Sequence, residues 1–136
     1  MKVEPYVFFD GRCDEAIEFY KKALGAKVNM LMRYKDSPDL NSAMIPPGGE
    51  NKVMHSNVSI GDSQVMMSDG HCGGTPKFDG FTLSITGSSD AEVERIFKAL
   101  SEGGAVNMPL TKTFFSSKFG MVNDKFGVSW MVLVAQ

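Results

Sequence analysis

The chain has few of the features that mark several large classes of protein. Its two cysteines, Cys13 and Cys72, lie far apart and form no disulfide framework, so we expect reduced thiols and a cytoplasmic location. No apolar run approaches the roughly 20 residues that a membrane-spanning helix needs. Glu4 and Pro5 interrupt the apolar residues at the N-terminus, which argues against a signal peptide.

The chain also has no large excess of positive or negative charge. The 14 Lys and Arg residues and 16 Asp and Glu residues give a net charge of -2, and the basic residues form no cluster. We therefore expect neither a nucleic-acid nor an anionic-membrane partner. The 136 residues, 43% of them hydrophobic, suit one soluble domain over 1–136 with its own core. Ten methionines suit a packed core or an adaptable pocket, and the core is the commoner use.

Residues 52–69 predict a β-hairpin with its turn at Gly61-Asp62. Alternation along the two strands gives the hairpin one polar and one apolar face. We expect a helix to cover the apolar face and the polar face to line a wet cavity. The polar face carries His55, Asn57, Ser59, Gln64, Met66 and Ser68, and the apolar face carries Met54, Val58, Ile60, Val65 and Met67.

Two amphipathic segments predict helices. The first starts at Cys13 and ends at Gly25, a suitable left-handed terminator. The second opens with Ser89 as N-cap and Glu92 three residues later, a capping-box pattern, and stops at Gly103. Apolar runs predict strands at 3–9, 27–34, 80–86, 105–110, 121–122 and 128–135, and polar loops are expected at 36–50 and 111–118.

A shift of 76 residues aligns a strand and a helix of the first half with those of the second. It places Val7 on Leu83, Ile17 on Val93 and Leu24 on Leu100. This internal repeat predicts an α+β fold of two βαβββ modules, at 1–69 and 80–136, joined by a linker at 70–79. Each curved, mainly antiparallel sheet would carry its helix on the outer face, and the two inner faces would enclose a cup.

The doubled βαβββ order resembles the vicinal-oxygen-chelate superfamily, which includes glyoxalase I, fosfomycin- and bleomycin-resistance proteins and extradiol dioxygenases with the dihydroxybiphenyl dioxygenase fold. More narrowly, the PhnB-like branch is similar in the segments FFDGRCDEAIEFYKKALGA, VMHSNVSIGDSQVMMSD, GFTLSI and DKFGVSWMV. The resemblance covers nearly the whole chain and implies a homodimer. That branch has also been labelled a 3-demethylubiquinone 3-methyltransferase. The sequence does not support this label, because its glycine-rich GHCGGT lies in the linker.

The resemblance also implies a divalent metal held by His or Glu from the first and last strands of each module. Proline and phenylalanine cannot ligate a metal, and a thioether is a poor ligand for zinc, nickel or manganese. We therefore predict neither the family's metal nor another cofactor, and leave open whether the protein is an enzyme. The residues at the implied positions are Pro5, Phe81, Met66 (or Met67 with a register slip) and Met131.

His55 is the sharpest candidate for a general base or a ligand contact, and the alternative is a histidine hydrogen-bonded within its sheet. The polar residues lining the cup would be His55, Ser68 and Ser129. Its apolar lining would be Met66, Phe81, Leu83 and Met131, while Phe114 and Phe115 at the rim would either stack on a planar ligand or pack on the sheet.

Other candidates favour structural interpretations. Asp69, His71 and Cys72 match no metal motif, and the glycines around them favour a solvated loop. Cys13 has no base near it in sequence, and Trp130 is expected under a helix because it alternates with Met131.

The predicted function is binding of a small apolar or aromatic molecule in the inter-module cup, without a metal. One alternative is a metal-dependent lyase, isomerase or dioxygenase with unusual ligands such as Glu4, His55 or Asp69. Another is a non-catalytic structural or interaction module whose cup is filled by its own side chains.

Overall fold

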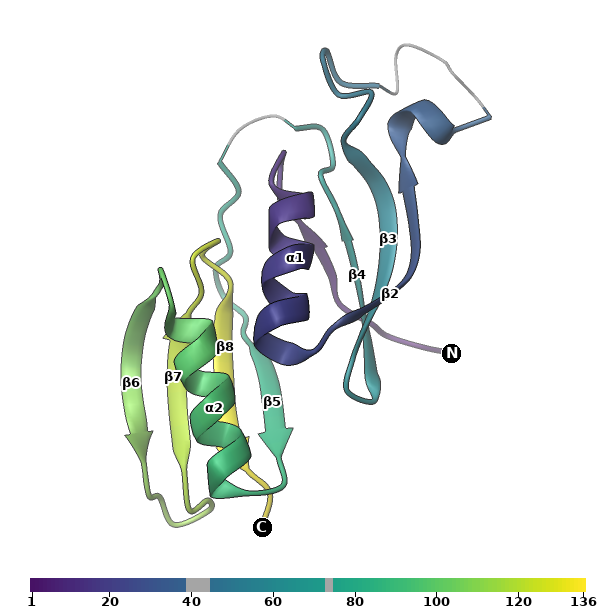
Figure 1. The fold of residues 1–136 in the computed structure, drawn as a ribbon. Coiled ribbons are helices and arrows are strands. Elements are labelled where there is room, and N and C mark those ends of the chain that lie inside the picture. Colours follow the sequence, from purple (N-terminus) through teal and green to yellow (C-terminus); the bar gives the residue numbers. More distant parts are fainter. Residues whose placement is uncertain (39–44, 73–74) are drawn as a thin grey trace. The chain divides into compact units, whose positions relative to one another are not determined.

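The computed structural model describes residues 1–38, 45–72 and 75–136. The chain divides into two compact units, Met1–Pro76 and Lys77–Gln136, and each is described by itself (Figure 1). The boundary between them falls inside the predicted linker at 70–79. The single-domain organisation stays a prediction.

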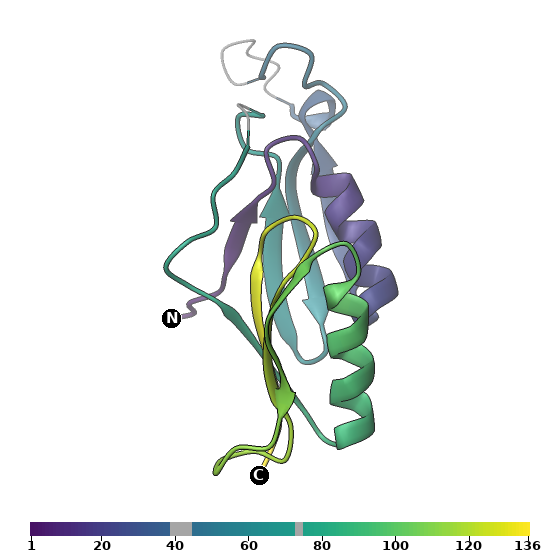
Figure 2. The same cartoon turned by 90° about the vertical axis from the view of Figure 1, so that its left-hand side faces the viewer.

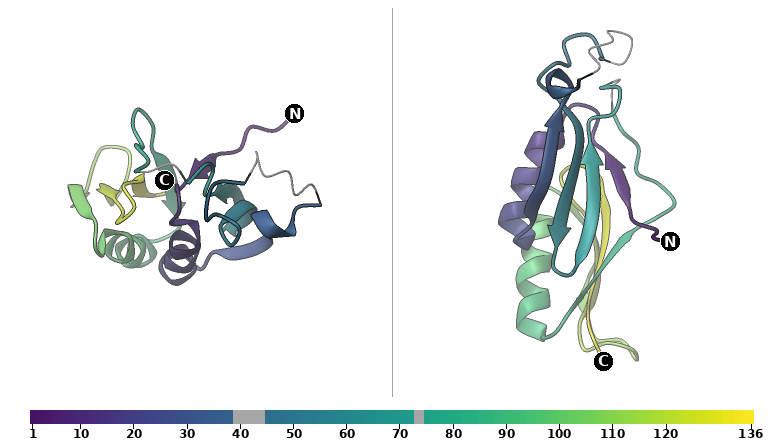
Figure 3. Two further views of the ribbon diagram at one scale, coloured as in Figure 1. Left: turned by 90° about the horizontal axis from the view of Figure 1, so that it is seen from above. Right: turned by 90° about the vertical axis from the view of Figure 1, so that its right-hand side faces the viewer.

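The first unit has a four-stranded sheet in the order β1-β4-β3-β2. Strand β1 runs parallel to β4, and the other neighbours are antiparallel (Figure 3, right). The elements are β1 (Tyr6–Phe8), α1 (Cys13–Leu24), β2 (Lys27–Arg33), the 3-10 helix η1 (Tyr34–Asp36), β3 (Val53–Ile60) and β4 (Ser63–Ser68).

The second unit repeats this topology with the order β5-β8-β7-β6. Figure 2 shows α2 lying along one side of this sheet. The parallel pair is β5 with β8, and the remaining pairs are antiparallel. Two βαβββ units with mainly antiparallel sheets confirm the predicted α+β fold. The elements are β5 (Leu83–Gly87), α2 (Asp90–Ser101), β6 (Ala105–Thr111), β7 (Phe119–Asn123) and β8 (Ser129–Val134).

Both helices follow the predicted periodicity and end signals. Gly25 adopts a left-handed φ of 67° after α1, and its N–H donates to the Lys21 carbonyl. The Ser89 Oγ accepts from the Glu92 N–H at the start of α2. Within the described chain, neither helix is long and apolar enough to cross a membrane. The buried faces are Cys13, Ala16, Ile17, Tyr20 and Ala23 in α1, and Val93, Ile96, Phe97 and Leu100 in α2.

The internal repeat is present, but its offset is longer than the predicted 76 residues. Helices α1 and α2 begin 77 positions apart, at Cys13 and Asp90, and β2 and β6 begin 78 positions apart. The loop between the first strand and the helix differs in length between the units, so no single offset fits both elements. In strand register, the residue that corresponds to Val7 is Ile85 and not Leu83.

The hairpin β3-β4 turns at Gly61-Asp62 as predicted. Its helix-side face includes Val58, Val65 and Met67, together with the fully buried Ser56, whose hydroxyl donates to the Met67 carbonyl. The expectation that the methionines mainly fill the core is wrong for the described part of the chain, where Met67 alone is in the buried core. Most of the others alternate with core residues and project from the opposite face of a sheet.

Candidate functional site

In each unit, one face of the sheet packs against the unit's own helix, and we call the other face the open face. On the first sheet, Met66 lies opposite Tyr6 on β1 and opposite Asn57 on β3. These half-buried residues alternate with the buried Val7 and Met67, which lie on the helix side. The open face of the first unit therefore carries aromatic, amide and thioether side chains together.

Tyr6 and His55 form the most specific contact on this open face. The Tyr6 Oη and the His55 Nδ1 are 2.8 Å apart, a hydrogen bond whose donor depends on the histidine tautomer. The two rings stack with centroids 5.5 Å apart, and Phe8 packs against Tyr6 at 4.8 Å. Since Tyr6 occupies Nδ1, the ring nitrogen that His55 could offer to a ligand is Nε2.

A strip of polar side chains lies beside this aromatic group. The Asn29 side chain donates to Asn57 Oδ1 at 2.9 Å and to Ser59 Oγ at 2.7 Å. The Asn57 amide in turn donates to Gln64 Oε1 at 3.3 Å. Asn29 occupies a register irregularity between Val28 and Met30, and this lets β2 aim its amide at β3. The predicted polar face is therefore a connected hydrogen-bonded strip.

Methionines border the aromatic group on both sides. Met32 lies directly opposite His55, and Met66 lies directly opposite Tyr6. Thioether side chains are flexible and make favourable contacts with aromatic rings. Such a lining adapts to an apolar ligand more easily than branched side chains would.

The predicted site residues of the first unit are only partly brought together. His55 and Met66 share the open face, on the neighbouring strands β3 and β4. Ser68 is only 1% exposed, and its Oγ accepts from the Gly70 N–H. Its hydroxyl therefore serves the loop that follows β4. Tyr6 was missed because a short aromatic strand gives no sign of which distant residue it contacts.

The predicted residues of the second unit occupy different faces. Met131 and Ser129 lie on its open face, where Ser129 Oγ is 3.0 Å from Thr82 Oγ1. Leu83 lies opposite Trp130, which is buried on the α2 side as expected. Three phenylalanines are exposed: Phe81 packs edge-on against Phe78, and Phe114 and Phe115 pack edge-on against each other.

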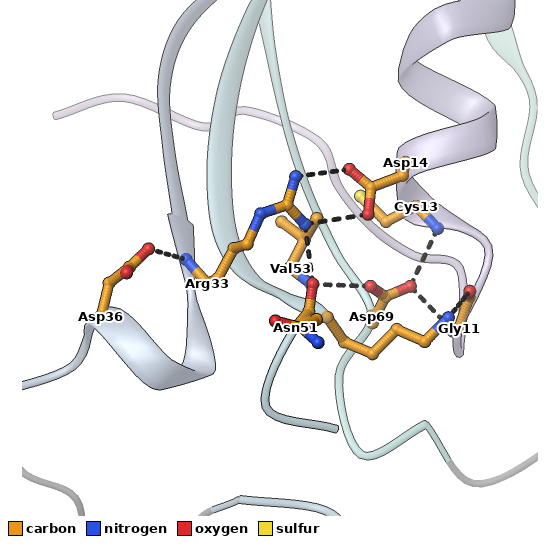
Figure 4. Close-up of polar contacts among 9 residues, drawn as sticks. Gly11, Cys13, Asp14, Arg33, Asp36, Asn51, Val53 and Asp69 are labelled. Carbon is orange, nitrogen blue, oxygen red and sulfur yellow. Dashed lines mark hydrogen bonds and ion pairs between the residues drawn. The ribbon is translucent and has the colours of Figure 1, made fainter. Parts of the chain in front are cut away.

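The expectation of a solvated Asp69 is wrong, because its carboxylate is fully buried. Oδ1 accepts from the Gly11 and Cys13 N–H groups, and Oδ2 accepts from the Val53 N–H, each at 2.8 Å (Figure 4). Helix α1 has no side-chain cap from Arg12, so Asp69 supplies the acceptor at its first turn. Asp69 therefore has a structural role. Its neighbour His71 is exposed.

Arg33 extends this network, and sequence reasoning missed it. Its guanidinium forms a two-pronged ion pair with Asp14, at 2.9 and 3.0 Å, and also donates to the Asn51 carbonyl (Figure 4). The hydrogen bond that Arg33 donates to Asp14 raises the pKa of Arg33 above its usual value. Lys52 Nζ donates to the Gly11 carbonyl in the same region. These contacts fix the start of α1 against the ends of β2 and β3.

The two cysteines should differ strongly in reactivity. Burial raises the pKa of Cys13 most, and the charges of Asp69 and Asp14 raise it further. Burial also raises the pKa of Cys72, but this thiol is partly exposed. Because the thiolate is the reactive form, we expect a thiol reagent at pH 8 to modify only Cys72 in the native protein, and to modify it slowly. In urea the reagent should modify both cysteines.

A Cys72→Ser variant is the control for this experiment. It should show no native labelling and one equivalent of labelling in urea. Rapid native labelling that persists in Cys72→Ser would contradict the burial of Cys13.

The donors on the two sheets do not fit the superfamily's divalent metal. Within residues 1–38, 45–72 and 75–136, no group of three or more His, Cys, Asp and Glu side chains could hold an ion. Both carboxylate oxygens of Asp69 are already engaged by backbone N–H groups. Hydroxyl and thioether groups suit zinc, nickel and manganese poorly. The residues at the first-strand and last-strand positions are Pro5, Tyr6, Met66, Phe81, Ser84 and Met131.

Comparisons with known proteins agree with the fold. A family model described as 3-demethylubiquinone-9 3-methyltransferase matches residues 1–133. Protein YjdN of Escherichia coli (strain K12) is 35% identical over an alignment of 142 residues. The alignment covers 100% of this chain and 97% of YjdN. The crystal structure of protein PA1353 from Pseudomonas aeruginosa has a TM-score of 0.86 and 38% identity, covering 100% of this chain and 98% of that chain.

Two further structures extend the comparison, one at the level of the family and one at the level of the fold alone. A PhnB protein from Bacillus cereus, described as a candidate 3-demethylubiquinone-9 3-methyltransferase, has a TM-score of 0.81 at 31% identity, covering 99% and 100% of the two chains. A glyoxylase/bleomycin resistance protein/dioxygenase domain from Frankia sp. EAN1pec shares the fold alone, with a TM-score of 0.69 at 16% identity over 98% and 94% of the chains. The chain belongs to the PhnB-like family, whose model carries the 3-demethylubiquinone-9 3-methyltransferase description.

Proposed function

We propose that the open face of the first sheet binds a small aromatic or apolar molecule without the superfamily's divalent metal. The observation that carries this proposal is the Tyr6–His55 pair, hydrogen-bonded at 2.8 Å and stacked on a half-buried sheet face. Phe8, which is 51% exposed, extends the aromatic surface, and Met66 lies beside it. Aromatic and thioether groups together favour a planar, apolar ligand.

The polar groups beside this surface define the rest of the ligand. His55 Nε2 and the amides of Asn29 and Asn57 can donate to or accept from a polar edge. A few polar groups next to an apolar surface orient a ligand, while the apolar area supplies most of the affinity. The ligand class is therefore a planar ring system with one polar edge.

The sequence also led us to propose that residues of the second unit contribute to ligand binding in a cup between the modules. Homodimerisation and a cytoplasmic location are two further proposals from the sequence. The second-unit residues assigned to that cup are Phe81, Leu83, Phe114, Phe115, Ser129 and Met131.

A metal-dependent lyase, isomerase or dioxygenase would need ligands from Glu4, His55 or Asp69. The engagement of both Asp69 oxygens by three N–H groups counts against this alternative. Stoichiometric zinc, nickel, iron or manganese in protein purified without a histidine tag would favour it. A non-catalytic interaction module would gain support if no small molecule bound.

A thermal-shift screen with aromatic and antibiotic-like compounds, followed by calorimetry on the hits, tests the proposal. We expect Tyr6→Phe to weaken a bound hit by about 3- to 10-fold, since it removes one hydrogen bond of about 0.5–1.5 kcal/mol from the site. We expect His55→Gln to weaken the same hit at least as much, because it removes both the ring and the Nε2 group.

The matched control is His71→Gln, because His71 is exposed and follows β4 in the chain, so it belongs to no strand of this sheet. It should leave the affinity unchanged. An affinity unaffected by both Tyr6→Phe and His55→Gln, or lowered equally by His71→Gln, would contradict binding at this face.

A further inference from the structure

The open face of the second sheet carries three methionines in one continuous row. Met108 on β6 lies directly opposite Met121 on β7, and Met121 lies directly opposite Met131 on β8. Three neighbouring strands thus present thioethers at the same level of the sheet. Ser84 on β5 continues the row beyond Met131.

The alternation of the strands places this row on the face away from α2. Its members alternate with Val122 and Val132, which are fully buried. Gly120 is on the α2 side too, because a Cβ there would meet the Phe97 ring of α2 at 2.7 Å. Met108 is 41% exposed, and Met121 and Met131 are half-buried. The three thioether side chains are therefore not packed in the core beneath α2.

The spacing of the row allows the three sulfur atoms to converge. Side chains directly opposite each other on antiparallel strands have Cβ atoms about 4.5–5.5 Å apart. A methionine side chain has three rotatable bonds, so the outer two can bend toward Met121. On one side the row is bordered by the pair Phe119 and Leu133, an apolar border that disfavours strongly hydrated cations.

We propose that the row of Met108, Met121 and Met131 binds one soft monovalent cation, Cu(I) in the cell and Ag(I) as its laboratory analogue. Neutral thioether ligands select soft monovalent ions, whereas zinc prefers thiolate, imidazole or carboxylate donors, and magnesium and manganese prefer oxygen donors. This site is separate from the Tyr6–His55 surface of the first sheet and shares only Met131 with the second-unit residues assigned to the proposed cup.

The first unit provides an internal comparison. Its corresponding row has Met30 opposite Asn57 and Asn57 opposite Met66. The middle position is an amide that is already hydrogen-bonded to Asn29 and Gln64. Two thioethers separated by an engaged amide make a poorer soft-ion site, so binding should be confined to the second unit.

The test is a titration of full-length Cys72→Ser protein with Ag(I) in chloride-free buffer. This background removes the accessible thiol, and Cys13 is buried. The methionine methyl groups carry a carbon-13 label and are followed by NMR. We expect the methyl resonances of the three row residues to shift and saturate at one equivalent, while those of Met30 and Met66 stay in place.

Substitution with leucine keeps the volume and removes the sulfur. Met121→Leu should weaken Ag(I) binding by about tenfold or more, because it removes the central ligand. Met30→Leu, the matched control in the first unit, should leave binding unchanged. Met108→Leu, at the more exposed edge of the row, provides a second variant should Met121→Leu fail to fold. Shifts spread over all methionines, no shift at one equivalent, or an affinity insensitive to the row substitutions would overturn the proposal.

Discussion

Replacement of Asp69 by alanine is expected to lower the free energy of unfolding by about 3–5 kcal/mol. The carboxylate is fully buried and accepts from three backbone N–H groups, of Gly11, Cys13 and Val53, each at 2.8 Å. Alanine would leave all three donors without this acceptor, and each of the two that are buried, the N–H groups of Cys13 and Val53, costs about 1–3 kcal/mol. Urea unfolding followed by circular dichroism measures the change.

Two further variants separate the lost hydrogen bonds from other effects. Asp69→Asn keeps the shape but replaces one accepting oxygen with an NH2 group, so we expect a smaller loss of about 2–3 kcal/mol. Asp62→Ala, at the exposed turn of the β3-β4 hairpin, is the matched control and should leave stability unchanged. A loss below about 1 kcal/mol for Asp69→Ala would contradict a structural role for this carboxylate.

The features that could be predicted from the sequence are those that local chemistry decides. The Ser89 hydroxyl and the Gly25 backbone act within a few residues of themselves, and both do so as predicted. Hydrophobic periodicity likewise identifies both helices and the hairpin. The fold follows because each amphipathic helix must cover the apolar face of a sheet.

The register of the repeat could not be obtained from periodicity alone. A shift of 76 residues superposes apolar positions, but the loops of the two units differ in length, and the strand pairing gives an offset of 78 for the first two strands of each unit. A stronger signal was present in the sequence: the tripeptide Val-Asn-Met recurs at 28–30 and 106–108. Both copies contain a register irregularity at the asparagine, and Asn107 donates to Asn123 much as Asn29 donates to Asn57.

The candidate site depends on contacts between distant segments, which a single sequence does not reveal. Tyr6 and His55 are 49 positions apart, and no local pattern pairs them. The glycines around Asp69 indicated a solvated loop, but the N–H groups that bind its carboxylate come from two other segments of the chain. The methionines were expected in the core because composition does not tell which face of a strand they occupy.

The second unit has its own buried aspartate, Asp124, which is only 3% exposed. Its Oδ1 accepts from the Phe126 and Val128 N–H groups at 2.9 and 3.1 Å, and its Oδ2 accepts from Trp130 Nε1 at 2.8 Å. The carboxylate thus closes the turn between β7 and β8 and fixes the indole. Each unit therefore uses one buried carboxylate to hold a loop against its sheet.

Asp124→Asn is expected to lower the free energy of unfolding by about 2–3 kcal/mol and to change the fluorescence of the native protein. Trp130 is the only tryptophan, so its emission reports on the Nε1 hydrogen bond directly. Urea unfolding followed by this emission gives both the free energy of unfolding and the fluorescence of the native protein in one experiment. Asp79→Asn, an exposed aspartate in the same unit, is the control and should change neither. An unaltered native emission together with unaltered stability would show that the Asp124 carboxylate does not hold the indole, because an amide cannot replace both accepting oxygens.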